Sequence, residues 1–279
     1  MDMDREFHSG KNYVVSDQRS ALESTGARSL YRIEPEIDEL SYMANRIRNN
    51  LSSRLSGAMK AKRVFDIIAA GIALVLLSPV FLIAALLIKI ESRGTVFYTQ
   101  ERIGLNRRNG DRRTEFKPVE NDRRNRNDRR KNMHAGQPFN IYKFRTMVSD
   151  AEQSGPVLAS ENDPRITRMG RIFRKTRIDE IPQFINVLKG EMSIIGPRPE
   201  RSFFINQMKS EVPDFPARLL VKPGITGLAQ VENGYTQTLE RMKEKLFYDL
   251  KYISEISLLE EIKILFKTVY VVVTGKGAC

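Results

Sequence analysis

One adjacent pair of acidic residues in this chain, Asp179 and Glu180, lies among many cations. With a single cysteine, Cys279, and two histidines, the side chains available for chemistry are carboxylates, arginines and lysines. Six basic residues precede the pair within 15 positions, and a helix N-terminus surrounded by cations is a place where phosphate binds. The spacing therefore predicts a phosphate-binding site beside the acidic pair. The six are Arg165, Arg168, Arg171, Arg174, Lys175 and Arg177.

The acidic pair is predicted to open a helix over residues 179–189, with Pro182 in its first turn and Gly190 as its stop. Helical spacing puts Asp179, Gln183 and Asn186 on one face, away from the apolar stripe. A structural role is the alternative, with Asp179 as the helix N-cap and Glu180 as an acid that complements the helix dipole. The surrounding cations weaken that alternative.

Two further segments contribute cations. Prolines on both sides of Arg198 restrict the backbone, which suits a bidentate contact with phosphate, although a rigid structural turn explains them equally well. A strand is predicted from residue 139 to 147, and its alternation places Lys143 and Arg145 on one face. The chain has no Walker-type loop and no G-x-G-x-x-G motif, which counts against P-loop NTPases and Rossmann dinucleotide enzymes.

The composition points to an anionic partner, since 46 Lys and Arg oppose 34 Asp and Glu, giving a net charge of +12. One cysteine excludes an intramolecular disulfide and any cysteine-based zinc or iron-sulfur site. His8 and His134 both lie in polar surroundings, which makes histidine-based metal or acid-base chemistry improbable.

Residues 64–90 are predicted to be embedded in a membrane, because only three polar side chains interrupt them. The segment begins too far along the chain to be a cleaved signal peptide. A straight helix of this length would measure about 40 Å, enough to span a bilayer. Basic residues at both ends, and Ser78-Pro79 in the middle, favour a re-entrant hairpin with both ends on the cytoplasmic side. A kinked spanning helix is the alternative.

Residues 106–131 carry half of the net charge, with eleven basic and five acidic side chains. Such a composition predicts a solvated, disordered insertion, because it cannot bury enough surface to offset the entropy of ordering. An arginine-rich patch for nucleic acid or anionic lipid is the alternative. Nucleic acid is not favoured as a partner, since no aromatic side chains are interleaved for base stacking.

Two amphipathic helices are also predicted. Between Ile37 and Leu55, apolar residues recur at three- and four-residue steps, and this face needs a membrane surface or a partner helix to cover it. Residues 258–273 are strongly apolar with lysines spaced through them, which is typical of a helix lying in the membrane interface.

A series of motifs, in this order, resembles the bacterial sugar transferase family. These are monotopic polyprenyl-phosphate phosphoglycosyl transferases, which start the assembly of exopolysaccharide, O-antigen and glycoprotein glycans. The resemblance covers residues 60–279 apart from the insertion at 106–133. It rests on KRVFD (62–66), SP (78–79), QERIG (100–104), YKFRTM (142–147), NDPRITRMGRIFRKTRIDEIPQFINVLKGEMSIIGPRPE (162–200) and KPGITGLAQV (222–231).

The resemblance implies transfer of sugar 1-phosphate from a UDP-sugar to a polyprenyl phosphate such as undecaprenyl phosphate, with release of UMP. It makes Asp179 the nucleophile and Glu180 its assistant, both serving as ligands of Mg²⁺. It identifies Ser78-Pro79 with the break in the family's re-entrant helix. The residues expected to bind substrate or phosphate are Lys143, Arg145, Arg165, Arg174, Gln183 and Arg198.

We therefore expect an α/β fold, mostly helical with short strands. A tail and amphipathic helix (1–59) would precede the re-entrant membrane helix (60–93) and a compact cytosolic catalytic region (94–279) with the disordered insertion at 106–133. The enzyme would be monotopic, in contact with membrane lipid at the cytoplasmic face of the bacterial inner membrane.

Two rival interpretations are direct attack by the lipid phosphate, without a covalent intermediate, and a membrane-anchored binding module. Where many relatives read N-G-R, this chain has Tyr235 in place of arginine. The role of Tyr235, the sugar, the glycan pathway and the oligomeric state, a homo-oligomer included, stay open.

Overall fold

The computed structural model describes residues 35–106, 136–148, 151, 163–233 and 238–274, and for residues 50–58 it describes the backbone alone. The predicted tail, nearly all of the basic insertion, both histidines, Tyr235 and Cys279 lie outside the described residues.

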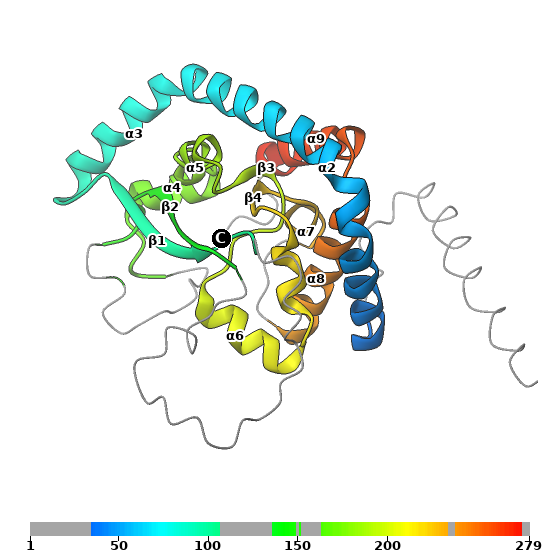
Figure 1. The fold of residues 1–279 in the computed structure, drawn as a ribbon. Helices are drawn as coiled ribbons and strands as arrows, with labels where there is room; N and C mark the ends of the chain where they lie inside the picture. The colour runs from blue at the N-terminus through cyan, green and yellow to red at the C-terminus, as the bar shows by residue number, and fades with distance from the viewer. Residues whose placement is uncertain (1–34, 107–135, 149–150, 152–162, 234–237, 275–279) are drawn as a thin grey trace, which may run out of the picture. The chain divides into compact units, whose positions relative to one another are not determined.

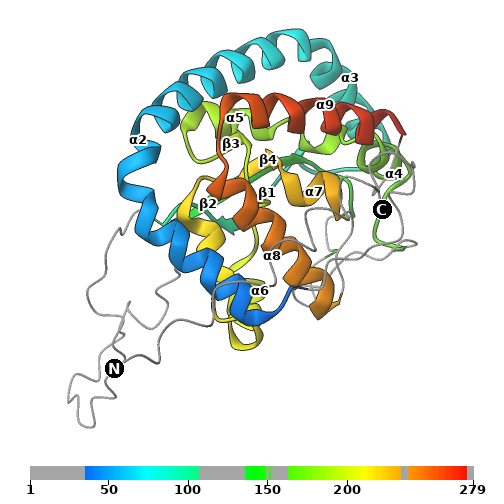
Figure 2. The same ribbon diagram turned by 90° about the vertical axis from the view of Figure 1, so that its right-hand side faces the viewer.

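The first described helix, α2 (Ile37–Leu76), is continuous over 40 residues. The predicted amphipathic helix and the first half of the predicted membrane segment are therefore one element, with no break in the backbone between residues 59 and 60. Leu40, Ala44 and Ile47 are buried in the main core, and this part of α2 lies beside α8 (Leu239–Ser254) in Figure 2. The apolar face of residues 37–49 thus rests on the body of the same chain.

A sharp bend separates α2 from α3 (Ser78–Glu91). Because Pro79 has no N–H, it cannot donate to the carbonyl of Val75, and the hydroxyl of Ser78 donates to that carbonyl instead, at 2.8 Å. The predicted kink is confirmed. Within the described ranges no single helix meets the length and composition needed to cross a bilayer, whereas Met59–Leu76 and Ser78–Glu91 meet them together, bent by 58°.

The first arm of this bent pair is hydrogen-bonded to two elements of the body. Arg63 donates to the carbonyls of Val187 and Leu188, at 2.6 and 2.9 Å, at the C-terminal end of α5 (Gln183–Lys189). One turn later, Asp66 accepts hydrogen bonds of 3.0 Å from the backbone N–H of Ile194 and from the neighbouring serine hydroxyl, both in β3 (Ser193–Ile195).

The second arm is tied to the same body. The guanidinium of Arg145 donates to the carbonyls of Ser92 and Arg93, at 2.9 and 2.7 Å, directly after α3. Glu91, the last residue of α3, accepts from the backbone N–H of Met169 in the first turn of α4 (Arg168–Lys175). The start of the first arm and the end of the second arm are therefore both attached to the same body of the protein.

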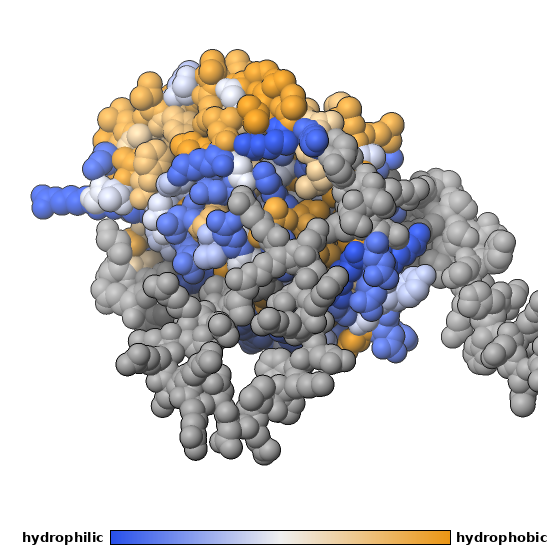
Figure 3. Space-filling view, viewed as in Figure 1, coloured by the Kyte–Doolittle hydropathy of each residue, from blue (hydrophilic) through white to orange (hydrophobic). Residues whose placement is uncertain are grey.

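Apolar side chains gather on one face of the molecule, over the bend and the adjoining helix arms in Figure 3. Large apolar residues of the second half of α2, of α3 and of α9 (Leu258–Thr274) are 40–80% exposed, in numbers unusual for a surface in water. They are Val64, Ile67, Ile68, Ile72, Val75 and Leu76 on α2, Leu82, Ile83, Leu86 and Ile90 on α3, and Leu258, Leu259, Ile262, Phe266, Val269, Tyr270, Val272 and Val273 on α9.

The strands within the described residues form two small sheets. Antiparallel β1 (Phe97–Ile103) and β2 (Pro138–Phe144) pair with Gln100 opposite Ile141, and β3 pairs in parallel with β4 (Gly224–Thr226). Around them lie α6 (Ser202–Glu211), the 3-10 helix η2 (Phe215–Leu220) and α7 (Leu228–Glu232) (Figure 1). The expected mixture of many helices with a few short strands is confirmed.

Candidate active site

Asp179 and Glu180 lie on the 3-10 turn η1 (Ile178–Glu180), so the expected helix start at residue 179 is wrong. The helix α5 begins at Gln183, because Pro182 cannot donate the hydrogen bond that a helix running through it would need. The turn is set by Arg177, which adopts the left-handed conformation with φ 59°. Among the residues that the structure describes, no side chain caps α5, so the structure does not support an N-cap role for Asp179. Both carboxylates are only 7% exposed.

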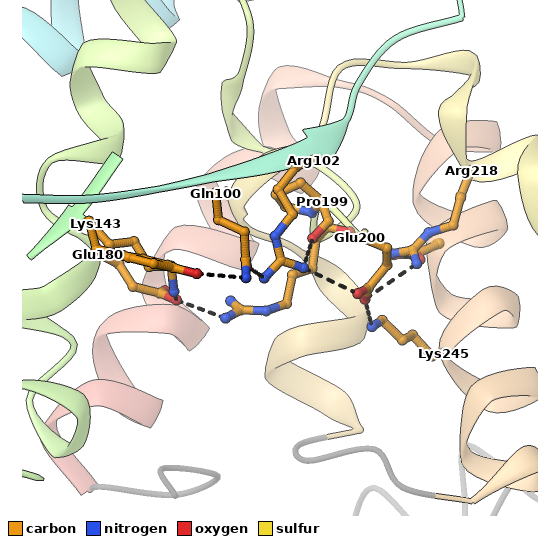
Figure 4. A network of polar contacts seen from close by, with 11 residues as sticks. Gln100, Arg102, Lys143, Glu180, Pro199, Glu200, Arg218 and Lys245 are labelled. Atoms are coloured by element: carbon orange, nitrogen blue, oxygen red, sulfur yellow. Dashed lines mark hydrogen bonds and ion pairs between the residues drawn. The ribbon is translucent and has the colours of Figure 1, made fainter. Parts of the chain in front are cut away.

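Two cations converge on one oxygen of Glu180. Lys143 Nζ, from β2, lies 2.7 Å from Glu180 Oε1, and Arg198 Nη2 lies 2.8 Å from the same atom. Lys143 Nζ is also 3.6 Å from Asp179 Oδ2. Figure 4 shows Lys143 and Glu180 next to each other at one end of the drawn network. Strand β2, turn η1 and the turn after β3 therefore bring together four of the predicted site residues.

The two carboxylates have opposite electrostatic settings. Burial raises the pKa of Asp179, and the charge of Glu180 adds to this effect, so that together they outweigh the attraction of Lys143. Burial also acts to raise the pKa of Glu180, but Arg198 and Lys143 outweigh it and hold this pKa well below its usual value. The negative charge of Glu180 in turn raises the pKa of Arg198. The ion pair is centred on Glu180, and Asp179 is the more basic carboxylate.

Arg198 is carried by a turn that packs tightly on the turn before β4. Gly196 N–H donates to the carbonyl of Thr226 at 2.8 Å, and Gly224 N–H donates to that of Pro197 at 2.9 Å. A Cβ at Gly224 would lie 2.1 Å from the nitrogen of Gly196, so this approach of two backbones requires glycine. The two proline-glycine motifs of the sequence thus fix one another and place Arg198.

Behind Arg198 lies a buried ionic network that the sequence analysis missed. Arg218 donates to the carbonyl of Arg198 at 2.9 Å and pairs with Asp249 at 2.8 Å. Glu200 contacts Lys245 at 2.5 Å and lies 3.6 Å from Arg218, within the group drawn in Figure 4. These cations hold the pKa of Glu200 at about 2 against the opposing effect of burial. The sequence feature that could have indicated this network is a charged residue next to apolar ones, such as Arg218 before Leu219 and Leu220.

The other predicted site residues have different surroundings. The guanidinium Nε of Arg174 donates to the hydroxyl of Thr146 at 3.0 Å, and its charge lowers the pKa of Asp179. Gln183 is buried, and its amide nitrogen has no hydrogen-bond partner within the part of the chain that the structure describes. Phosphate binding by Arg174 and substrate binding by Gln183 stay predictions.

Arg145 and Arg165 make structural contacts. Arg145 binds the backbone at the end of α3, as described above. Arg165 forms a paired contact with Asp163, with Nη2 at 2.6 Å, and its hydrogen bonds lower the pKa of that carboxyl to about 2. Arg165 also donates to the carbonyl of Ala151. Substrate binding by these two arginines stays a prediction.

Comparison with known proteins gives consistent matches. The profile of a family described as "Bacterial sugar transferase" matches residues 57–132 and 124–275. A UDP-N-acetylgalactosamine-undecaprenyl-phosphate N-acetylgalactosaminephosphotransferase of Aeromonas hydrophila is 41% identical over 82% of this chain and 48% of its own length. A UDP-glucose:undecaprenyl-phosphate glucose-1-phosphate transferase of Klebsiella pneumoniae is 36% identical over 79% of this chain and 42% of its own length.

A shorter relative, the exopolysaccharide production protein PSS of Rhizobium leguminosarum bv. phaseoli, is 37% identical over 77% of this chain and 97% of its own length. The chain thus spans about half the length of the first two relatives and nearly all of the third. The similarity lies in the region that carries the acidic pair and the bent helices.

Proposed function

Because this chain belongs to the bacterial sugar transferase family, we propose that it transfers sugar 1-phosphate from a UDP-sugar to undecaprenyl phosphate. UMP leaves, and the lipid-linked product begins the assembly of exopolysaccharide or a related glycan. The observation that carries this proposal is the buried pair Asp179–Glu180, with Lys143 beside both carboxylates and Arg198 paired with Glu180. The relatives from Aeromonas hydrophila and Klebsiella pneumoniae are named for a reaction of the same kind.

Asp179 is the nucleophile of the proposed reaction. Its carboxylate oxygen attacks the phosphorus that bears the sugar, and the bond from this phosphorus to the bridging oxygen breaks, so that UMP departs with the electron pair. An oxygen of the lipid phosphate then attacks the aspartyl phosphosugar, and Asp179 is released as a carboxylate. Covalent catalysis of this kind divides one difficult displacement into two easier ones.

The different settings of the two carboxylates support these roles. Lys143 and Arg198 occupy an oxygen of Glu180, whereas the contact of Asp179 with Lys143 is longer, at 3.6 Å. The pKa of Asp179 is raised, chiefly by burial, which makes the ionised carboxylate a stronger base and nucleophile. Glu180 keeps two cations in place, where they can neutralise the charge of the incoming diphosphate.

The donor set fits Mg²⁺, which commonly takes one or two protein carboxylates and completes its shell with water and substrate phosphates. Among the residues described, no group of three or more His, Cys, Asp or Glu side chains could hold a metal. The adjacent buried carboxylates of η1, Asp179 and Glu180, would be the protein ligands. When bound, the ion would neutralise charge on the diphosphate and favour approach by a carboxylate.

We place the protein at the cytoplasmic face of the plasma membrane, as a monotopic enzyme. Both arms of the bent pair are tied to one body, through Arg63 and Asp66 on one arm and Glu91 and Ser92 on the other. A spanning helix would carry its ends to opposite sides of the bilayer. The exposed apolar residues of α2, α3 and α9 supply a surface that lipid would cover.

The direct test is a transfer assay with the purified chain, undecaprenyl phosphate and a panel of UDP-sugars that includes UDP-glucose and UDP-N-acetylgalactosamine. We expect UMP and a lipid-linked sugar diphosphate to form in equal amounts, in a Mg²⁺-dependent reaction. A folded protein that releases no UMP with any UDP-sugar, or that releases free sugar phosphate, would contradict the proposal.

A further inference from the structure

Asn186 joins α5 to the free edge of β2. Its side chain is fully buried. Its Oδ1 accepts the backbone N–H of Tyr142 at 3.0 Å, and its Nδ2 donates to the carbonyl of Asn140 at 2.7 Å. Residues 140 and 142 are alternate positions of the strand, so these groups point to the same edge. The side chain thus makes the two hydrogen bonds that one residue of a neighbouring parallel strand would make.

The orientation of this amide is determined by a third contact. Nδ2 also donates to Glu191 Oε2 at 2.7 Å, so both amide protons and the amide oxygen have partners. A flipped amide would bring its oxygen against the Asn140 carbonyl and the Glu191 carboxylate. The link between α5 and β2 therefore has a single geometry.

This link lies directly beside the acidic pair. Lys143 follows Tyr142 in β2, and its Nζ reaches Glu180 Oε1 at 2.7 Å. The turn η1, which carries Asp179 and Glu180, leads into α5 through residues 181 and 182. The distance from Lys143 to both carboxylates therefore depends on how α5 sits on the edge of β2. Asn186 holds that position from the buried side, and Lys189 at the end of α5 adds an exposed hydrogen bond of 2.6 Å to the hydroxyl of Tyr142.

We propose that Asn186 is a positioning residue of the transfer reaction, which acts by holding Lys143 against Asp179 and Glu180. This inference rests on the proposed function. A side chain that only stabilises the fold would affect the rate whether or not Lys143 is present. The proposed effect of Asn186 on the rate depends on Lys143. A double-mutant cycle measures such a dependence directly.

The experiment compares Asn186→Ala in two backgrounds, the natural chain and Lys143→Met, with the UDP-sugar that the natural chain turns over. In the natural chain we expect kcat to fall at least about tenfold, with a smaller change in KM. In the Lys143→Met background the same substitution should change kcat by less than about twofold. Equal losses in both backgrounds would overturn the inference.

A matched control removes a side-chain hydrogen bond that involves neither α5 nor β2. Thr268 and Thr226 share a 2.8 Å hydrogen bond between α9 and β4, and Thr268→Val should leave kcat within about twofold in either background. If Asn186→Ala does not fold, the pair Asn186→Asp with Glu191→Gln preserves shape and charge but removes donation to Asn140. The same comparison then applies to this pair.

Amide hydrogen exchange provides a measurement that needs no turnover. Loss of the Asn186 contact should speed exchange of the Tyr142 amide, while the amide of Gly196, which bonds Thr226, should be unaffected. Unchanged exchange at Tyr142 would overturn the inference. A natural chain that exchanges as expected but releases no UMP would contradict the proposed function instead.

Discussion

Lys143 Nζ lies 2.7 Å from the nearest oxygen of Glu180 and 3.6 Å from that of Asp179. One lysine thus pairs closely with one acid and leaves its neighbour more weakly held, although the two carboxylates are adjacent in sequence. This asymmetry distinguishes the proposed nucleophile from its assistant and leads to three predictions about the chemistry.

Asp179→Asn should abolish the first chemical step. Without lipid acceptor, the natural chain should release about one equivalent of UMP and retain sugar phosphate on Asp179. The amide keeps the shape of the side chain but is a poor nucleophile, so the burst should disappear and turnover should fall by roughly three orders of magnitude or more. Rapid-quench measurement of UMP checks this. Near-normal turnover of the variant, or no burst from the natural chain, would favour direct attack by the lipid phosphate.

Glu180→Gln should impair turnover for a different reason. The variant loses the charge that holds Lys143 and Arg198, and one proposed ligand of Mg²⁺. We expect a rate loss that is partly recovered as Mg²⁺ is raised, whereas Asp179→Asn should not recover. Titration of Mg²⁺ for both variants checks this difference, and identical responses would argue against separate roles.

The burst should be lost on the acid side of its pH profile. Attack requires ionised Asp179, and burial raises the pKa of this group, so the midpoint should lie above the usual aspartate value of about 4. Lys143 acts to lower the pKa of Asp179, so Lys143→Met should move the midpoint to higher pH. Burst amplitudes and rates across pH give both midpoints. A shift to lower pH in the variant would contradict the assignment.

The two ends of the bent helices should face the cytoplasm. Single cysteines at Lys60 and Arg93, in a Cys279→Ser background, should both resist an impermeant thiol reagent in intact cells and react after lysis. Labelling of either one from the periplasm would contradict the hairpin. Pro79→Leu restores the missing backbone donor, so it should straighten the helix and expose one end or destabilise the protein.

Arg218→Met should strongly destabilise the fold. The side chain is almost wholly buried and pairs with Asp249, so its loss leaves a buried carboxylate without its partner. Breaking such a pair costs about 3–5 kcal/mol, whereas replacing both members with apolar residues is far milder. Thermal unfolding should therefore show a large loss for Arg218→Met and substantial recovery in the double variant with Asp249→Leu. Equal stability of Arg218→Met and the natural chain would show that the pair contributes nothing.

The sequence by itself determined the local features of this protein. A proline inside a helix predicts a kink. The structure bends at Pro79, and the hydroxyl of Ser78 donates to the carbonyl of Val75 that proline leaves without its usual donor. Gly190 predicts the end of α5, and its φ of 82° is one that glycine readily adopts. The family is also evident from ordered motifs. These features depend on a few consecutive residues, which is why the sequence is sufficient.

Only the tertiary structure decided which distant residues meet. Lys143 and Arg145 were predicted together, yet they diverge, since Lys143 reaches Glu180 and Arg145 reaches the backbone after α3. The strand predicted over 139–147 ends at Phe144 in the structure, so Arg145 lies just beyond β2 and the strand alternation no longer fixes its direction. The position of Asp179 on a 3-10 turn, and the contact of Asn186 with β2, depend likewise on how α5 packs against that strand. Packing between elements far apart in the chain depends on the complementary surfaces of those elements. A pattern of a few consecutive residues cannot predict it.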